Sequence, residues 1–115
     1  MQFSTEYGTI GISNDVIATV ASDTASTCFG VKGLASSSTI DGIVRILKGE
    51  TRKKGVKVRC QDDGTIALQL RIIVLSGVNI QAVCSSIIKE VKYMVTKRTG
   101  LTVGTVEVLV EAVKA

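Results

Sequence analysis

Hydrophobic and polar residues follow two different periods along this chain, and each period predicts one kind of element. Apolar residues recur at the three- and four-residue spacing of a helix through residues 14–28 and 80–98. They alternate with polar residues, as on a strand with one buried face, through residues 56–60, 65–74 and 102–112. The pattern therefore predicts two long amphipathic helices and at least three half-buried strands.

Polar residues and glycines at the ends of these stretches predict where the elements begin and end. Short polar side chains at residues 13–15, and Asn79 before the second helix, can accept hydrogen bonds from the first free amides of a helix. Gly30 and Gly100 are expected to end the two helices, because glycine tolerates the left-handed backbone that follows a helix. The segment 61–64 ends in Asp-Gly, which predicts a tight hairpin turn between the two middle strands.

Four other stretches have weaker patterns. Residues 6–13 alternate weakly and predict a short first strand. Residues 31–38 are rich in Gly, Ala and Ser and fit a short strand followed by a loop. Apolar residues at helical spacing predict a short third helix over residues 39–47, and the charged segment 48–55 predicts a loop or turn.

The element order, roughly β-α-(β)-α-β-β-α-β, predicts an α+β fold with one domain over residues 1–115. One mostly antiparallel sheet is expected, covered on one face by two main helices and the short third helix, as a two-layer sandwich. The outer face of the sheet is expected to contact water, because it carries Lys57, Arg59, Gln69, Arg71, Glu107 and Glu111.

Composition narrows the chemistry that such a domain can perform. The chain contains no histidine, which removes the commonest general base and both Ser-His-Asp and Cys-His catalysis. Cys28 and Cys84 fall on apolar helix faces and Cys60 on the inward face of a strand, so all three are expected as buried small hydrophobes. Asp62 and Asp63 fit turn chemistry. We therefore expect a binding protein with no enzymatic activity, cofactor or metal.

The net charge of +4 arises mainly from one basic stretch, residues 48–59. This stretch either holds phosphates of a nucleic acid or lipid, or is a solvated turn that protects a sheet edge. No aromatic residue lies within it, which favours the solvated turn. Its candidate anion or partner contacts are Lys48, Arg52, Lys53, Lys54, Lys57 and Arg59.

A second short motif also has a nucleic-acid interpretation. Residues 30–33 match the G-x-x-G spacing with which KH domains clamp a nucleic-acid backbone. In a KH domain this loop joins two helices, whereas residues 34–38 here lack a clear helical pattern. The two glycines are therefore expected as a helix cap followed by a turn.

Features that bear on location point to the cytoplasm. Residues 1–13 have neither the basic start nor the apolar run of a secretory signal peptide. The apolar stretches have the length of strands, whereas a membrane helix needs roughly 20 apolar residues. Three cysteines without a C-x-x-C pair favour a reducing compartment.

Three stretches that together span nearly the whole chain carry a family pattern. They are Ile12-Ser13-Asn14-Asp15-Val16-Ile17 through Gly30-Val31, then Gly55-Val56-Lys57-Val58 through Gly77-Val78-Asn79-Ile80, then Val91, Thr99-Gly100-Leu101 and Val106-Glu107-Val108-Leu109-Val110. This pattern resembles the alkaline shock protein family of Gram-positive bacteria, whose members are also called general-stress or envelope-stress proteins. The resemblance implies a cytoplasmic, non-enzymatic protein of cell-envelope homeostasis, without catalytic residues.

The resemblance also implies protein partners. Some members of the family lie under the membrane, recruited by a separate membrane-anchored protein, and some self-assemble into oligomers. We therefore expect a scaffold or interaction protein that contacts partners through the open edges of the sheet and its polar outer face. The alternative function is a small basic nucleic-acid-binding module that uses segment 48–59. A small enzyme is the third hypothesis, and no convergent set of reactive groups supports it.

Overall fold

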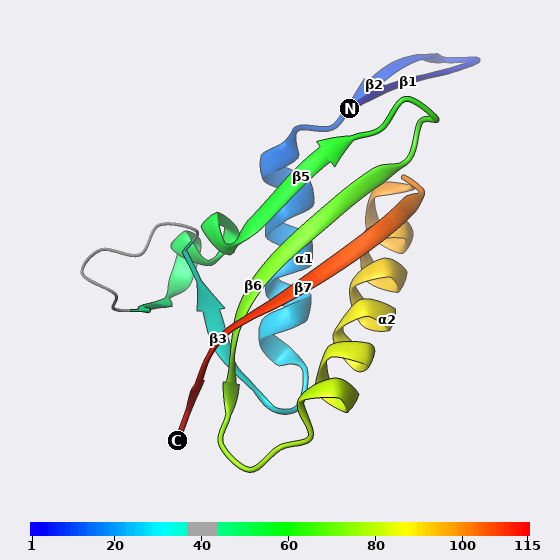
Figure 1. Cartoon of the computed structure of the whole chain (residues 1–115). Coiled ribbons are helices and arrows are strands. Elements are labelled where there is room, and N and C mark those ends of the chain that lie inside the picture. The colour runs from blue at the N-terminus through cyan, green and yellow to red at the C-terminus, as the bar shows by residue number, and fades with distance from the viewer. Residues whose placement is uncertain (37–43) are drawn as a thin grey trace.

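The computed structural model describes residues 1–36 and 44–115. Within these residues, two long helices lie side by side on one face of a five-stranded sheet, which confirms the predicted two-layer α+β fold (Figure 1). The elements are β1 (Gln2–Thr5), β2 (Gly8–Gly11), α1 (Asn14–Thr27), β3 (Val31–Ala35), β4 (Ile46–Leu47), the 3₁₀ helix η1 (Gly49–Gly55), β5 (Val56–Cys60), β6 (Ile66–Leu75), α2 (Ile80–Thr99) and β7 (Val103–Lys114).

Strand β6 is the centre of the sheet. Along one side it pairs antiparallel with β5 through residues 66–70 and with β3 through residues 72–74, and β4 extends the sheet beyond β3. Along the other side it pairs with β7 in parallel over its full length. The β6–β7 pair is parallel because α2 returns the chain to the end of the sheet where β6 began. The sheet is therefore mostly antiparallel, as predicted, with one long parallel pair.

Three of the four ends of the two long helices lie at the predicted capping residues, whereas α1 ends at Thr27 with Cys28 as its cap, two residues before the predicted Gly30. The side chain of Ser13 accepts a hydrogen bond from the Val16 amide at 3.2 Å, and that of Asn79 accepts one from the Ala82 amide at 3.0 Å. Gly100 follows α2 with a φ of 76°, in the left-handed region. These contacts satisfy amides and carbonyls that a helix leaves free at its ends.

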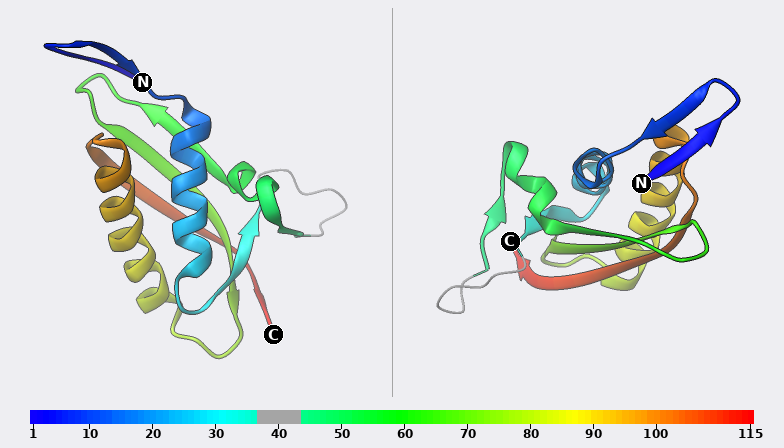
Figure 2. Two further views of the ribbon diagram at one scale, coloured as in Figure 1. Left: turned by 180° about the vertical axis from the view of Figure 1, so that it is seen from behind. Right: turned by 90° about the horizontal axis from the view of Figure 1, so that it is seen from above.

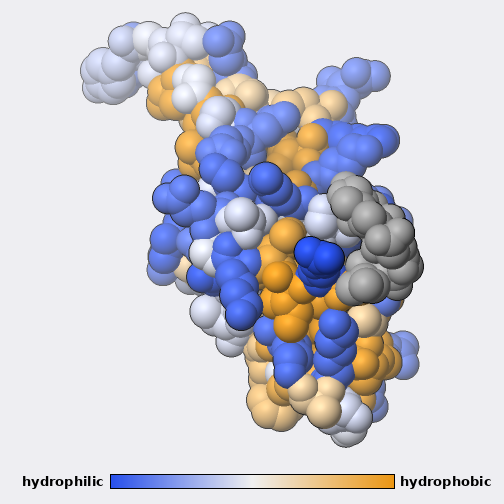
Figure 3. All heavy atoms as spheres, turned by 90° about the vertical axis from the view of Figure 1, so that its left-hand side faces the viewer, coloured by the Kyte–Doolittle hydropathy of each residue, from blue (hydrophilic) through white to orange (hydrophobic). Residues whose placement is uncertain are grey.

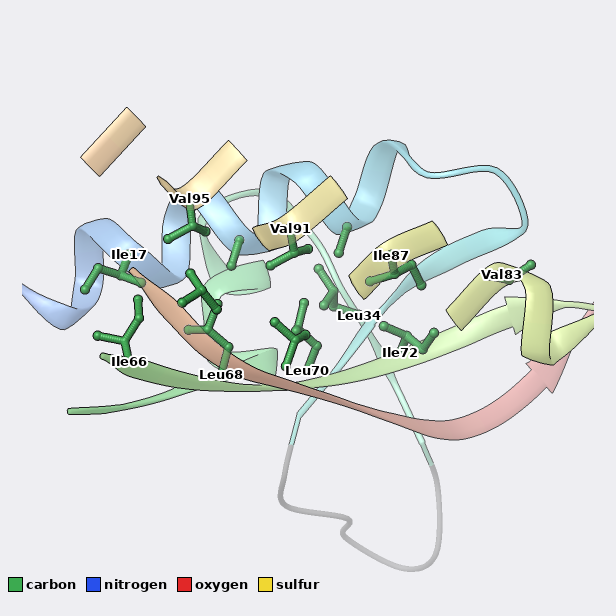
Figure 4. Close-up of a cluster of buried hydrophobic side chains, with 14 of the residues drawn as sticks. Ile17, Leu34, Ile66, Leu68, Leu70, Ile72, Val83, Ile87, Val91 and Val95 are labelled. Carbon is green, nitrogen blue, oxygen red and sulfur yellow. The ribbon is translucent and has the colours of Figure 1, made fainter. Parts of the chain in front are cut away.

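Aliphatic side chains from the two layers meet in the core, and Figure 4 shows how those of α2 point toward those of β6. The large core residues labelled there are all at most 5% exposed. Each such side chain contributes about 1.5–3 kcal/mol when it is buried. The main contributors are Ile17, Leu34, Ile66, Leu68, Leu70, Ile72, Val83, Ile87, Val91 and Val95.

The N-terminus forms a hairpin, so the prediction of one strand over residues 6–13 is wrong at its start. β1 and β2 pair antiparallel as a separate two-stranded ribbon, and residues 6–7 form the turn between them. Gly8, which follows the turn, adopts a φ of 145° that glycine tolerates. The ribbon projects beyond the end of the main sheet, as both views of Figure 2 show. The strands therefore form two sheets, where one was predicted.

The segment between β3 and β5 also differs from its prediction. Most of the predicted helix 39–47 lies outside the described residues, and Ile46 and Leu47 form β4, which contradicts a helix there. These two residues pair with Ala35 and Leu34, so a long-range pairing overrides their helical spacing. The predicted loop 48–55 instead contains η1.

Candidate interaction site

The six basic residues predicted as contacts lie on different parts of the molecule. Arg52 donates a hydrogen bond to the Ser26 hydroxyl at 3.0 Å, and Lys53 forms an ion pair with Asp15 at 3.0 Å, so both connect η1 to α1. Lys48 is exposed at the residue before η1. Lys54, near the end of η1, lines one pocket with Lys57, and Lys57 lines a second pocket with Arg59 on the outer face of the sheet. In Figure 3, which views the side of η1 and β4, hydrophobic side chains interrupt the hydrophilic ones. The basic stretch is therefore divided among several surfaces.

The outer face of the sheet is polar, as predicted, and its charges interact between strands. Gln69 donates a hydrogen bond to the Glu107 carboxylate at 2.6 Å, and Arg71 forms an ion pair with Glu111 at 2.5 Å. Both contacts join β6 to β7. They hold the two carboxylates of β7 over the sheet and away from its edge.

A second basic surface, which the sequence analysis did not single out, lies between α2 and the start of β7. We call it the α2–β7 groove. It is lined by Lys89, Lys92, Tyr93, Thr96, Lys97, Thr102 and Val103, with no carboxylate among the described residues that line it. The Lys97 ammonium lies 5.6 Å from the centre of the Tyr93 ring, which is within cation–π distance.

One signal in the sequence could have located this groove. The five groove residues on α2 are spaced at i, i+3, i+4, i+7 and i+8, which places them on one side of a helix. The helix itself was predicted correctly. The groove was not predicted, because nothing local in the sequence indicates which neighbour lies beside these lysines.

Strand β7 forms one edge of the sheet. Among residues 1–36 and 44–115, it pairs with no strand other than β6. The edge is 12 residues long, and about every second residue directs its N–H and C=O away from β6. Val103, the first residue of β7, also lines the α2–β7 groove, so the groove and the edge are adjacent.

The cysteines lie in two kinds of environment. Cys28 and Cys84 are half-buried, and burial raises the pKa of both thiols, with the Glu90 carboxylate raising that of Cys28 further. Cys60, the last residue of the edge strand β5, is exposed, so its predicted burial is wrong. Alternating apolar and polar residues predict which side chains of a strand point toward the helices. They do not predict how far the helices extend over that face of the sheet.

One of the two hairpin carboxylates, that of Asp63, acts as the turn chemistry predicts. The Asp63 carboxylate accepts hydrogen bonds from the Thr65 hydroxyl at 2.7 Å and from the Thr65 amide at 3.0 Å. These bonds lower the pKa of Asp63 below its usual value. Gly64 completes the turn with a φ of 85°.

The described part of the chain shows neither a metal site nor a membrane-spanning helix. No group of three or more His, Cys, Asp or Glu side chains is arranged to hold a metal ion there. None of the helices described is both long enough and apolar enough to cross a membrane. The described G-x-x-G segment joins α1 to β3 and not to a second helix, so it lacks the context of a KH loop.

These features define a small α+β domain whose main candidate contact surfaces are a basic groove and the adjacent sheet edge. The chain belongs to the alkaline shock protein family, also named the Asp23 family, where Asp23 is the name of the family and does not refer to residue 23 of this chain. The family model matches residues 2–115, and the family is described as having a cell envelope-related function.

Two relatives cover nearly the whole chain. A protein of Bacillus subtilis (strain 168) named YloU, described as uncharacterized, is 40% identical over 99% of this chain and 95% of its own length. Spy1614 of Streptococcus pyogenes serotype M6, also described as uncharacterized, is 37% identical over 99% of this chain and 94% of its own length. No solved structure gave a significant match.

Proposed function

We propose that this protein is a non-enzymatic scaffold or interaction protein of the cell-envelope stress response. It acts at the cytoplasmic side of the membrane through protein partners, including a separate membrane-anchored protein and further copies of itself. Its membership of a family with a cell envelope-related function supports the proposed role at the cell envelope. The open edge of β7 is the observation that carries the mode of action.

An open edge of this length favours a protein contact because natural proteins usually shorten, charge or cover such edges. The two carboxylates in the middle of β7, Glu107 and Glu111, are engaged by Gln69 and Arg71 on the outer face of the sheet. They are therefore poorly placed to repel an approaching strand. An added strand would satisfy the outward backbone groups of β7.

Nucleic-acid binding by segment 48–59 has less support. Arg52 and Lys53 are engaged by Ser26 and Asp15 on α1, and Glu107 lines the same pocket as Lys57 and Arg59 on the outer face of the sheet. A phosphate backbone binds best to a row of unpaired cations.

Cross-linking in living cells, followed by mass spectrometry of the linked peptides, tests the proposed function. We expect links between this chain and at least one membrane protein, and partition of the chain with the membrane fraction. An unrelated cytoplasmic protein with the same tag is the control. Recovery of no membrane protein, together with a monomer by light scattering, would contradict the proposal.

A further inference from the structure

The α2–β7 groove and the β7 edge have properties that together specify the chemistry of a partner. Three lysines line the groove, and Glu90, the carboxylate that lies within α2, is not among the residues that line it. The groove is therefore positively charged along the flank of α2 that faces β7. An occupant with carboxylates would complement it.

The groove also offers apolar contact. The Tyr93 side chain is 58% exposed, and Val103 and the aliphatic stems of the lysines complete the lining. Aromatic rings that are exposed beside cations commonly serve as contact residues in protein interfaces. An occupant that combines apolar and acidic side chains therefore fits this groove better than a uniformly polar one.

Strand addition to β7 would order such an occupant. Successive side chains of an added strand point to opposite faces of the sheet. One set would point toward α2, where Lys89 and Lys92 lie, and the other toward the outer face beside Glu107. Acidic residues at alternate positions would then meet the lysines, while the backbone pairs with β7.

A second copy of this chain fits the same edge poorly. Antiparallel pairing of β7 with its equivalent would bring the two α2 helices onto the same face of the joined sheet. Their rows of lysines would then face one another, and like charges in this position destabilise the pairing. Charge therefore favours an acidic partner over self-pairing at this edge.

We propose that the β7 edge and the α2–β7 groove bind an extended acidic segment of a partner protein by strand addition. Lys89 and Lys92 contact the carboxylates of that segment, and Tyr93 contacts its apolar side chains. This inference rests on the proposed function, in which the protein acts through protein partners, and it names the chemistry of one of them.

Fluorescence anisotropy with the full chain and a labelled synthetic peptide tests the charge requirement. The probe is a peptide of roughly ten residues that alternates glutamate and valine, with a lysine–valine peptide of equal length as its control. We expect only the acidic peptide to bind. The double variant K89E/K92E should weaken binding about tenfold or more, and added salt should weaken it as well.

The double variant K48E/K54E is the matched control, because it changes the net charge equally on exposed lysines in and next to η1. We expect it to leave the affinity nearly unchanged. Equal losses in the two double variants, or no loss in K89E/K92E, would overturn the role of the groove.

Hydrogen exchange read by mass spectrometry tests strand addition itself. Binding of the acidic peptide should slow amide exchange in residues 103–114, since their outward amides gain partners. Peptide binding without slower exchange there would overturn strand addition. Binding of vesicles made of equal parts phosphatidylglycerol and phosphatidylcholine, without peptide binding, would assign the lysines to anionic lipid and overturn the proposal. Binding of oligothymidylate alone would overturn it in the same way.

The cellular cross-linking experiment separates this inference from the proposed function. If K89E/K92E retains the same membrane-protein links as the natural chain, the α2–β7 groove is not the contact, although the proposed function stands. If the natural chain forms no such links, the proposed function fails regardless of how the peptide binds. Loss of links in K89E/K92E but not in K48E/K54E would support both.

Discussion

At the scale of single residues, Gly30 and Gly100 share a left-handed backbone but differ in their surroundings. Their φ angles are 85° and 76°. Gly100 caps α2, as the sequence predicted, whereas Gly30 lies in the turn that follows the Cys28 cap of α1. A methyl group added at Gly30 would lie 2.6 Å from a methyl of Val83. At Gly100, no described atom lies within 4 Å of the same position. The first position therefore combines backbone strain with close packing, and the second has backbone strain alone.

This difference predicts unequal losses of stability for the same substitution. Gly100→Ala should lower the free energy of unfolding by about 1 kcal/mol, which reflects the left-handed backbone alone. Gly30→Ala should lower it by about 1–3 kcal/mol more, because Val83 must also move. Urea denaturation followed by circular dichroism measures both. Equal losses in the two variants would show that α2 moves away from Gly30 without resistance.

At the scale of elements, the helices and most strands, including the short strands β3 and β5, followed their sequence patterns, whereas the short segments 6–13 and 46–47 did not. Helix α2 buries Ile87 completely but leaves Ile80, its first residue, 42% exposed. Its apolar spacing alone predicted both as buried. At residues 46–47 a helix was predicted from the apolar spacing, but these residues form a strand because they pair with β3. A short pattern contains too few positions to outweigh one tertiary contact.

The two isoleucines of α2 provide a matched test of this burial. Ile87→Ala should lower the free energy of unfolding by about 2–5 kcal/mol, since it leaves a cavity between α2 and the sheet. Ile80→Ala removes the same atoms from a partly exposed position, and its effect should stay within about 1 kcal/mol. Thermal and urea unfolding measure both variants. Similar losses would contradict the burial described for the two ends of α2.

At the scale of the whole molecule, the position of a strand in the sheet determines how well its backbone amides are protected from solvent. β6 has paired strands on both sides and helices over one face, whereas β7 has β6 on one side only. The β1–β2 ribbon pairs only with itself among the described residues and projects from the body. Two-stranded ribbons of this kind are marginally stable on their own.

Amide hydrogen exchange of the free protein should rank the strands accordingly. We expect residues 66–75 to exchange slowest, through global unfolding, and residues 2–11 to exchange fastest. In β7, outward amides should exchange faster than those bonded to β6. Backbone-resolved nuclear magnetic resonance measures this alternation, and uniformly slow exchange over residues 103–114 would contradict an open edge.

The amino-acid sequence by itself determined the elements that depend on near neighbours. Helical and strand periods, capping side chains such as Ser13 and Asn79, and the turn at Gly64 act over a few residues, so their structure followed directly. The two-layer α+β class followed from the order of these elements. The absence of histidine also removed whole classes of catalysis from consideration without any structure.

Only the tertiary structure decided which segments lie side by side. It placed β7 parallel to β6 at the edge of the sheet, brought Thr102 and Val103 beside the lysines of α2, and divided the basic segment 48–59 among several surfaces. Strand pairing joins residues that lie far apart in the chain, and the local hydrophobic period does not predict which strands pair. The candidate site arises from such pairing, because a row of lysines becomes a groove only when an edge strand lies next to it.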